Sequence, residues 1–272
     1  MGKSIVDVIL EYIRSKTDIV PETGVILSSG FEEFVDAIEN KIVIKYTDIP
    51  GFEVYGTEKE RGHFILGTID GRGVIAMDRR LHYHNGYKPS QLGTPIYVMK
   101  ELGCKRLIVS CSVGALSTKL KVGDVVTFTD QINLSSKSPL MDYAEMRYGH
   151  KFIDMSNPFD ISLVDNLVSI AKSELAIKVK KALFLELMGP NGETIAEANF
   201  AKQLGASVVG FNVACEVIAC RYCSLPVITL GLVTNYASAY SSGKIKHEDI
   251  AYNRKCASSY YVDTLIAFLK NI

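Results

Sequence analysis

Apolar, β-branched runs alternate with helical patterns along this chain, and that alternation most constrains its fold. Nine short runs are rich in Val, Ile and Leu, and seven other segments have apolar residues at helical spacing. Strands that alternate with helices are typical of a mainly parallel or mixed sheet covered by helices on both faces. Two of the runs, 63–69 and 73–77, are separated by Asp70-Gly71-Arg72, which indicates a hairpin. We therefore expect an α/β fold with a mixed sheet.

The positions of these elements suggest a single domain. The expected strands are 24–28, 42–46, 63–69, 73–77, 106–111, 125–129, 181–186, 207–210 and 227–234. The expected helices are 4–15, 31–38, 94–102, 161–174, 193–203, 215–223 and 247–270. No linker or repeat divides the chain, so we expect one domain over 1–272. The irregular stretch 131–157 is long for a compact domain and is interpreted as a functional or interface segment.

The charge balance excludes several classes of partner. The 272 residues include 30 Lys+Arg and 30 Asp+Glu, for a formal net charge of zero. This balance does not favour binding to nucleic acid or to an anionic membrane. The first residues do not form a signal peptide, and no run approaches the roughly 18 apolar residues of a membrane span. We expect a cytoplasmic protein.

Cysteine spacing offers one alternative function. Cys215, Cys220 and Cys223, followed by Cys256, match the spacing of plant-type iron–sulfur ligands. A cluster needs its thiolates in an irregular loop, whereas the first three lie in an amphipathic helical pattern. Packed, reduced thiols are therefore the favoured interpretation.

Two segments are candidate anion sites. Arg80 and His82 follow a buried run, and an arginine fork with an imidazole donor suits phosphate. A solvated polar turn explains them equally well, and a metal at His82-x-His84 lacks further ligands with recognisable spacing. Ser29 stands at a strand-to-helix turn whose amides and hydroxyl could bind an anion. Serine is also a common helix cap, and Glu32-Glu33 add negative charge there.

Polar residues at the ends of three other elements suggest a ligand site. Glu193 lies in a glycine-rich loop, Asn212 follows a short strand, and Asn235 ends a buried strand. Ligands of α/β folds bind at such ends. A carboxylate together with a carboxamide can read the donors and acceptors of a flat heterocycle. His247 at the start of the last helix is more often a solvated cap residue.

Eight segments, in order and with compatible spacing, resemble the trimeric purine nucleoside phosphorylase family, which includes methylthioadenosine phosphorylases. They are ILSSGF, RRLHYHNGY, LIVSCSVGALS, GDVVTFTDQINL, MGPNGETIAE, LGASVVGFNVACEVIACRYC, LVTN and KHEDI. The resemblance implies a central mixed sheet, partly barrel-like, flanked by helices. It also implies a homotrimeric transferase of purine salvage. Inorganic phosphate would attack the anomeric carbon of a purine (deoxy)ribonucleoside, releasing the base and a pentose 1-phosphate without any cofactor.

The resemblance also implies residue roles. Phosphate would be bound by Ser29, Arg80, His82, the backbone at Ser112, and Asn212. Glu193 would accept from the purine N1–H, and Asn235 would contact O6 and N7 of the departing base. The sugar would meet His84, Phe211, Asn212, His247 and, from across a subunit interface, Phe152. Glu193, Asn235 and His82 are the expected catalytic residues.

The combination of Glu193 and Asn235 suits 6-oxopurines such as inosine and guanosine. The chain departs from the family pattern at Phe31-Glu32-Glu33, Cys111, Gly192, Phe211-Asn212 and His84. These departures leave three alternatives open: a nucleoside hydrolase of the same fold, a methylthioadenosine phosphorylase-like enzyme, and a non-catalytic nucleoside-binding protein.

Overall fold

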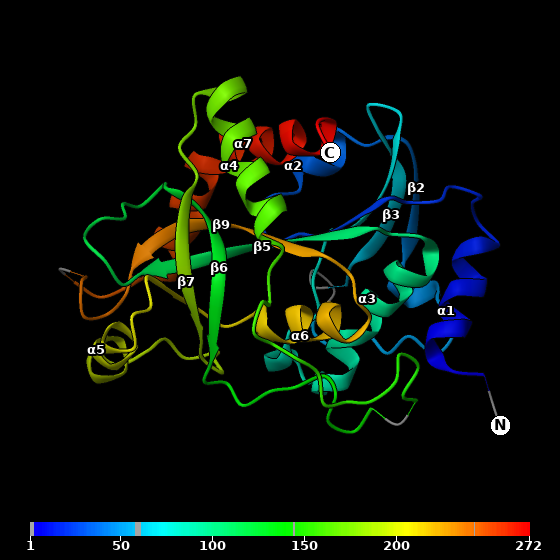
Figure 1. Cartoon of the computed structure of the whole chain (residues 1–272), viewed down its shortest axis with the longest axis horizontal. Helices are drawn as coiled ribbons and strands as arrows, with labels where there is room; N and C mark the ends of the chain where they lie inside the picture. Colours follow the sequence, from blue (N-terminus) through cyan, green and yellow to red (C-terminus); the bar gives the residue numbers. More distant parts are fainter. Residues whose placement is uncertain (1–2, 58–60, 144, 242) are drawn as a thin grey trace. The chain divides into compact units, whose positions relative to one another are not determined.

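The computed structural model describes residues 3–57, 61–143, 145–241 and 243–272 (Figure 1). Its strands are β1 (Thr23–Ile26), β2 (Glu39–Lys45), β3 (His63–Ile69), β4 (Arg72–Met77), β5 (Arg106–Ala115), β6 (Val125–Asn133), β7 (Lys180–Glu186), β8 (Val208–Gly210) and β9 (Val227–Tyr236). Its helices are α1 (Ile5–Arg14), α2 (Glu33–Asp36), α3 (Pro89–Leu102), α4 (Ile161–Leu175), α5 (Ile195–Gln203), α6 (Ala214–Tyr222) and α7 (His247–Lys270), with short 3-10 turns at Tyr46–Asp48 and Tyr83–Asn85. Every strand and helix expected from the sequence is present.

The chain clusters into two compact units, described separately below. Unit 1 comprises Met1–Val109, Ser138–Ser156 and Cys215–Val227. Unit 2 comprises Ser110–Lys137, Asn157–Ala214 and Ile228–Ile272. The single domain over 1–272 stays a prediction.

Unit 1 is built on the strands β2, β3, β4 and β1 and the first part of β5, in that order. β2, β3 and β4 are antiparallel, whereas β1 runs parallel to both β4 and β5. The β3–β4 hairpin turns at Asp70 and Gly71, whose φ angles of 53° and 74° both fit a two-residue primed turn. The expected hairpin and the mixed sheet are thus confirmed. α1 packs against α3.

Unit 2 contains a closed ring of strands. The order is β5, β8, β7, β6 and β9, and β9 also pairs with β5, which closes the ring. β7 is parallel to both β6 and β8, whereas the β5–β8 and β6–β9 pairs are antiparallel. β6 and β7 lie side by side in green in Figure 1, and α4 packs against α7. This ring confirms the partly barrel-like sheet.

Two of the helices have bounds that differ from the expected ones for a visible physical reason. The helix expected over 31–38 is reduced to α2, because amides at both of its ends bond three residues back and β2 begins at Glu39. The helix expected at 94 begins instead at Pro89, where a proline suits the first helical turn. Gly93 and Pro95 interrupt the apolar pattern inside α3. The sequence pattern therefore did not predict the first turn of this helix.

The cysteines on α6 and directly after it are packed thiols, as expected. Cys215, Cys220 and Cys223 are buried, and burial raises the pKa of the Cys220 thiol well above its usual value and that of Cys223 to about 12. Cys256 is exposed on α7. In the described part of the chain, no three metal-ligating side chains gather closely enough to hold an ion. No helix over those residues is both long and apolar enough to span a membrane.

Candidate active site

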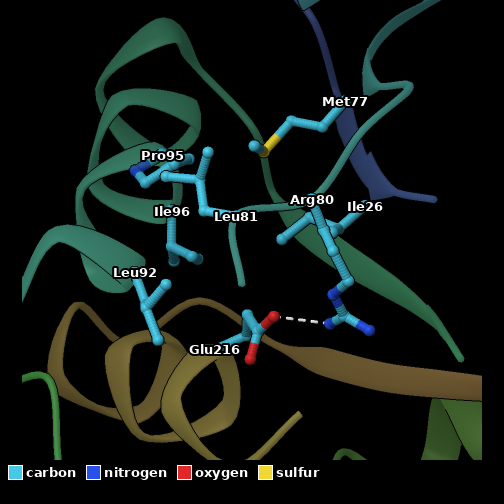
Figure 2. Close-up of a pocket in the computed structure, with 8 residues that line it drawn as sticks. All are labelled: Ile26, Met77, Arg80, Leu81, Leu92, Pro95, Ile96 and Glu216. Carbon is cyan, nitrogen blue, oxygen red and sulfur yellow. Dashed lines mark hydrogen bonds and ion pairs between the residues drawn. The ribbon is translucent and has the colours of Figure 1, made fainter. Parts of the chain in front are cut away.

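Arg80 lies in the segment after β4, separated from it by Asp78 and Arg79, and is buried in unit 1. Its Nη2 donates to Oε1 of Glu216 on α6 at 2.5 Å, and the Glu216 side chain is also buried (Figure 2). Both line a small pocket of about 180 Å³, a volume that includes open solvent, whose walls are Ile26, Met77, Arg80, Leu81, Leu92, Pro95, Ile96 and Glu216. The sequence interpretation missed Glu216, although an acidic residue among the apolar positions of the EVIAC pattern was a signal.

The two histidines after Arg80 form a stacked pair. The ring centroids of His82 and His84 are 4.6 Å apart, with an angle of 21° between the ring planes. His82 is half-buried and His84 is exposed. The imidazole expected to contact phosphate is therefore the more enclosed one, while the residue assigned to the sugar lies open to solvent.

The Ser29 turn carries its own carboxylate. Ser29 is exposed, and the amide of Gly30 donates to Oε1 of Glu32 at 3.1 Å. Arg79 donates to the same oxygen. Burial raises the pKa of the Glu32 carboxyl group, but the Gly30 and Glu32 amides and the Arg79 guanidinium outweigh it and hold that pKa below its usual range. Part of the proposed anion site thus already holds an anionic group of the chain.

In unit 2 the structure brings Glu193 to the segment that carries Asn235. Oε1 of Glu193 accepts from the backbone amide of Ser238 at 2.8 Å. Oδ1 of Asn235 accepts from the Thr234 hydroxyl, and its Nδ2 donates to the Tyr236 carbonyl, both at 3.0 Å. These two bonds orient the carboxamide, with oxygen and nitrogen assigned from the bonding pattern.

Small residues on β5 make room for this carboxamide. A Cβ at Gly114 would lie 3.1 Å from Nδ2 of Asn235, so glycine permits the close approach. Two residues earlier, the Ser112 hydroxyl is buried and has no hydrogen-bond partner among the described residues. The end of β5 that follows Ser112 is therefore adjacent to Asn235 at Gly114.

Phe211 and Asn212 follow β8 and are both half-buried. The Phe211 ring packs on Gly189, where an added Cβ would lie 3.0 Å from the ring. An added Cβ at Gly192, by contrast, would meet nothing within 4 Å. The loop that carries Glu193 is thus covered by Phe211 at one end and open at Gly192.

The last two candidates are exposed. His247 is the first residue of α7, and the Phe152 side chain is 100% exposed. Of all the candidates, those in unit 1 are Ser29, Arg80, His82, His84 and Phe152. Those in unit 2 are Ser112, Glu193, Phe211, Asn212, Asn235 and His247.

The sequence and the fold match a known class of protein. The family model described as the phosphorylase superfamily matches residues 22–270, and the chain belongs to this superfamily. Within it, the chain belongs to the purine nucleoside phosphorylase family. It is 34% identical to purine nucleoside phosphorylase 1 of Bacillus subtilis, over 88% of each chain, and 31% identical to the bovine enzyme, over 88% of this chain and 85% of that one.

A solved structure of a relative agrees. The structure of a Schistosoma purine nucleoside phosphorylase in complex with hypoxanthine superposes with a TM-score of 0.92 at 31% identity. It covers 100% of this chain and 99% of that chain. The α/β fold with its mixed sheet is therefore that of a purine nucleoside phosphorylase.

Proposed function

We propose that this protein is a purine nucleoside phosphorylase, a pentosyltransferase that cleaves the N-glycosidic bond of purine (deoxy)ribonucleosides with inorganic phosphate. The observation that carries the proposal is the joining of Glu193 to the Asn235 segment through the Ser238 amide, in a chain of this family. The expected substrates are inosine and guanosine, and the products are the free base and a pentose 1-phosphate.

The two unit 2 side chains suit a 6-oxopurine. A carboxylate accepts hydrogen bonds, so Glu193 would receive the ring N1–H. One N–H of the Asn235 amide is directed at the Tyr236 carbonyl, and the other would donate to N7. Negative charge develops on the purine as the glycosidic bond breaks. A donor already oriented by Tyr236 and Thr234 stabilises that charge in the transition state.

Phosphate is the proposed co-substrate, and no further cofactor is needed. Arg80 and His82 would bind it, with Ser29, Asn212 and the backbone at Ser112. The buried hydroxyl of Ser112 adds a hydrogen-bond donor beside its backbone amide. His84, Phe211, Asn212 and His247 would line the sugar.

A second candidate is a purine nucleoside hydrolase, in which water replaces phosphate as the nucleophile. It is favoured by the two carboxylates that engage proposed phosphate donors, Glu32 at the Gly30 amide and Glu216 at Arg80. Both would compete with an incoming anion.

The deciding experiment measures hypoxanthine release from inosine with and without inorganic phosphate. We expect release to require phosphate and to yield one ribose 1-phosphate for each base. Equal release in phosphate-free buffer would instead establish the hydrolase.

The same assay tests the base-reading residues. Glu193→Ala and Asn235→Ala should each lower kcat by about 10²-fold or more, the range seen when one hydrogen bond to a transition state is lost. Glu174→Ala, at an exposed position of α4, serves as a control and should retain most activity. Wild-type kinetics in either site variant would refute the assignment.

We further propose a cytoplasmic homotrimer acting in purine salvage, with Phe152 reaching the sugar site of a neighbouring subunit. The full exposure of the Phe152 side chain supports this role, since an aromatic ring in open water gains from burial against a partner.

A further inference from the structure

Unit 2 contains a buried ion pair that has no assigned role in the proposed phosphorylase reaction. Nζ of Lys137 lies 3.3 Å from Oε1 of Glu186, and both side chains are almost fully buried, at 4% and 1% exposure. Lys137 lies in the segment after β6, and Glu186 is the last residue of β7. Two charges taken out of water are tolerated only where hydrogen bonds satisfy them. The bonds they make therefore indicate what the pair holds in place.

The carboxylate of Glu186 connects two segments. Its Oε1 accepts from the Ser135 hydroxyl at 3.0 Å. Its Oε2 accepts from the backbone amide of Ala214, the first residue of α6, at 2.6 Å. A carboxylate is well matched to the amides that open a helix. The α6 start is therefore fixed to the end of β7.

The ammonium of Lys137 holds the other side of the same loop. Its Nζ donates to the carbonyl of Phe211 at 3.3 Å. The two members of the ion pair thus hydrogen-bond to the first and last residues of the segment Phe211–Ala214. Asn212, the residue proposed to meet sugar and phosphate, lies between these two contacts.

The backbone of this loop is strained. Val213 has a φ of 139°, a region that β-branched residues rarely adopt. Such conformations persist only where the surrounding structure over-determines them. The hydrogen bonds to Phe211 and Ala214 lie on either side of Val213 in the chain. The Lys137–Glu186 pair therefore restrains the backbone around this strained residue.

We propose that Lys137 and Glu186 are positioning residues that hold Asn212 in its reactive orientation through Phe211 and Ala214. This inference rests on the proposed function for the role of Asn212, whereas the restraint of the loop itself is independent of the activity. Without the pair, the loop would relax away from the strained Val213 conformation. Phosphate binding and turnover would then weaken together.

The test compares amide hydrogen exchange and kinetics in wild type, Lys137→Met and Glu186→Gln. We expect exchange across 211–214 to accelerate by about tenfold or more, since it reports local opening. We also expect KM for phosphate to rise and kcat to fall, each by about tenfold, because small misplacements of positioning groups have effects of this order or larger. Lys137→Arg keeps the charge and donors and should restore both readouts.

The matched control is Lys180→Met. Lys180 is the first residue of β7 and pairs with Asp124. The Lys180→Met substitution therefore removes an ion pair at the opposite end of the strand that carries Glu186. It should leave the exchange of 211–214 and both kinetic constants unchanged. If a single variant does not fold, Lys137→Met with Glu186→Leu leaves no unpaired charge buried and tests the same loss.

Three outcomes would overturn the inference. They are wild-type exchange across 211–214 in folded variants lacking the pair, faster exchange with unchanged KM and kcat, and an equal effect in Lys180→Met. A wild-type enzyme that releases base without phosphate would refute the proposed phosphorylase. The exchange data and the KM for nucleoside would still decide whether the pair positions the loop.

Discussion

Glu32 and Glu216 each place a carboxylate against a proposed phosphate donor, the Gly30 amide and Arg80 respectively. Motifs predicted the donors because each lies in a short recognisable segment. The partners could not be predicted in the same way. Arg80 and Glu216 are 136 residues apart, and only the fold brings them into contact. The buried pair of Lys137 and Glu186 was missed for the same reason.

Glu32 should weaken phosphate binding. Because its folded pKa lies below the usual range, the carboxylate stays ionised at neutral pH and competes with phosphate for the Gly30 amide and Arg79. Glu32→Ala should lower KM for phosphate by about tenfold, the lower end of the range for one charge-assisted hydrogen bond. The measurement is a phosphate titration at saturating inosine.

The neighbouring Glu33→Ala carries the same change in net charge and should alter KM far less. Equal effects of the two variants would show that general charge repulsion, and not occupancy of the amide, limits phosphate binding.

At the scale of elements, the sequence predicted which segments form strands and helices, because periodicity reports burial of one face. The predicted helix boundaries were wrong where side chains or neighbouring elements determine the boundary, as at α2 and α3. The 131–157 segment was predicted to be a functional or interface segment, but the sequence did not predict the contacts that hold it. Arg147 donates to Asp7 on α1 at 2.6 Å, and Tyr222 donates to the Gly149 carbonyl at 3.0 Å.

The start of α5 should control the position of Glu193. The hydroxyl of Thr194 accepts from the Glu197 amide at 3.2 Å, and the Glu197 carboxylate accepts from the Thr194 amide at 2.7 Å. Thr194→Ala should destabilise the protein by about 1 kcal/mol, as expected for a lost cap. It should also raise KM for inosine by severalfold, because Glu193 directly precedes the cap. Thermal unfolding and inosine titrations measure the two effects.

Thr194→Ser keeps the capping hydroxyl and should behave like wild type. A stability loss in Thr194→Ala without any change in KM would separate the cap from base recognition.

At the scale of the whole molecule, agreement with the Schistosoma enzyme over the entire chain shows that departures in the site leave the fold intact. The ring formed by β5, β8, β7, β6 and β9 explains this tolerance, since most of the proposed site residues lie near strand ends or in loops, whereas the ring depends on buried apolar positions. Assembly into a trimer, by contrast, depends on surface residues, and the hydrophobic periodicity of one chain does not identify them.

The proposed trimer predicts exchange of function between subunits. Light scattering should give about three times the 30.0 kDa chain mass. Phe152→Ala should retain stability, since the side chain is fully exposed in the isolated chain, but lose about tenfold in kcat/KM through poorer sugar positioning. Co-folded mixtures of Phe152→Ala and Glu193→Ala should be more active than either variant alone. Strictly additive activity would contradict a shared site.

The strand β2 has a consequence for handling this protein. It pairs with β3 and ends the strand order, and its exposed Ile42 and Val43 would suit pairing with another chain. A formal net charge of zero offers no colloidal repulsion to prevent such contact. The flanking Lys41 and Lys45 supply local charge that discourages edge-to-edge stacking. Lysine-modifying labels, or high salt that screens these charges, would therefore promote aggregation through this strand.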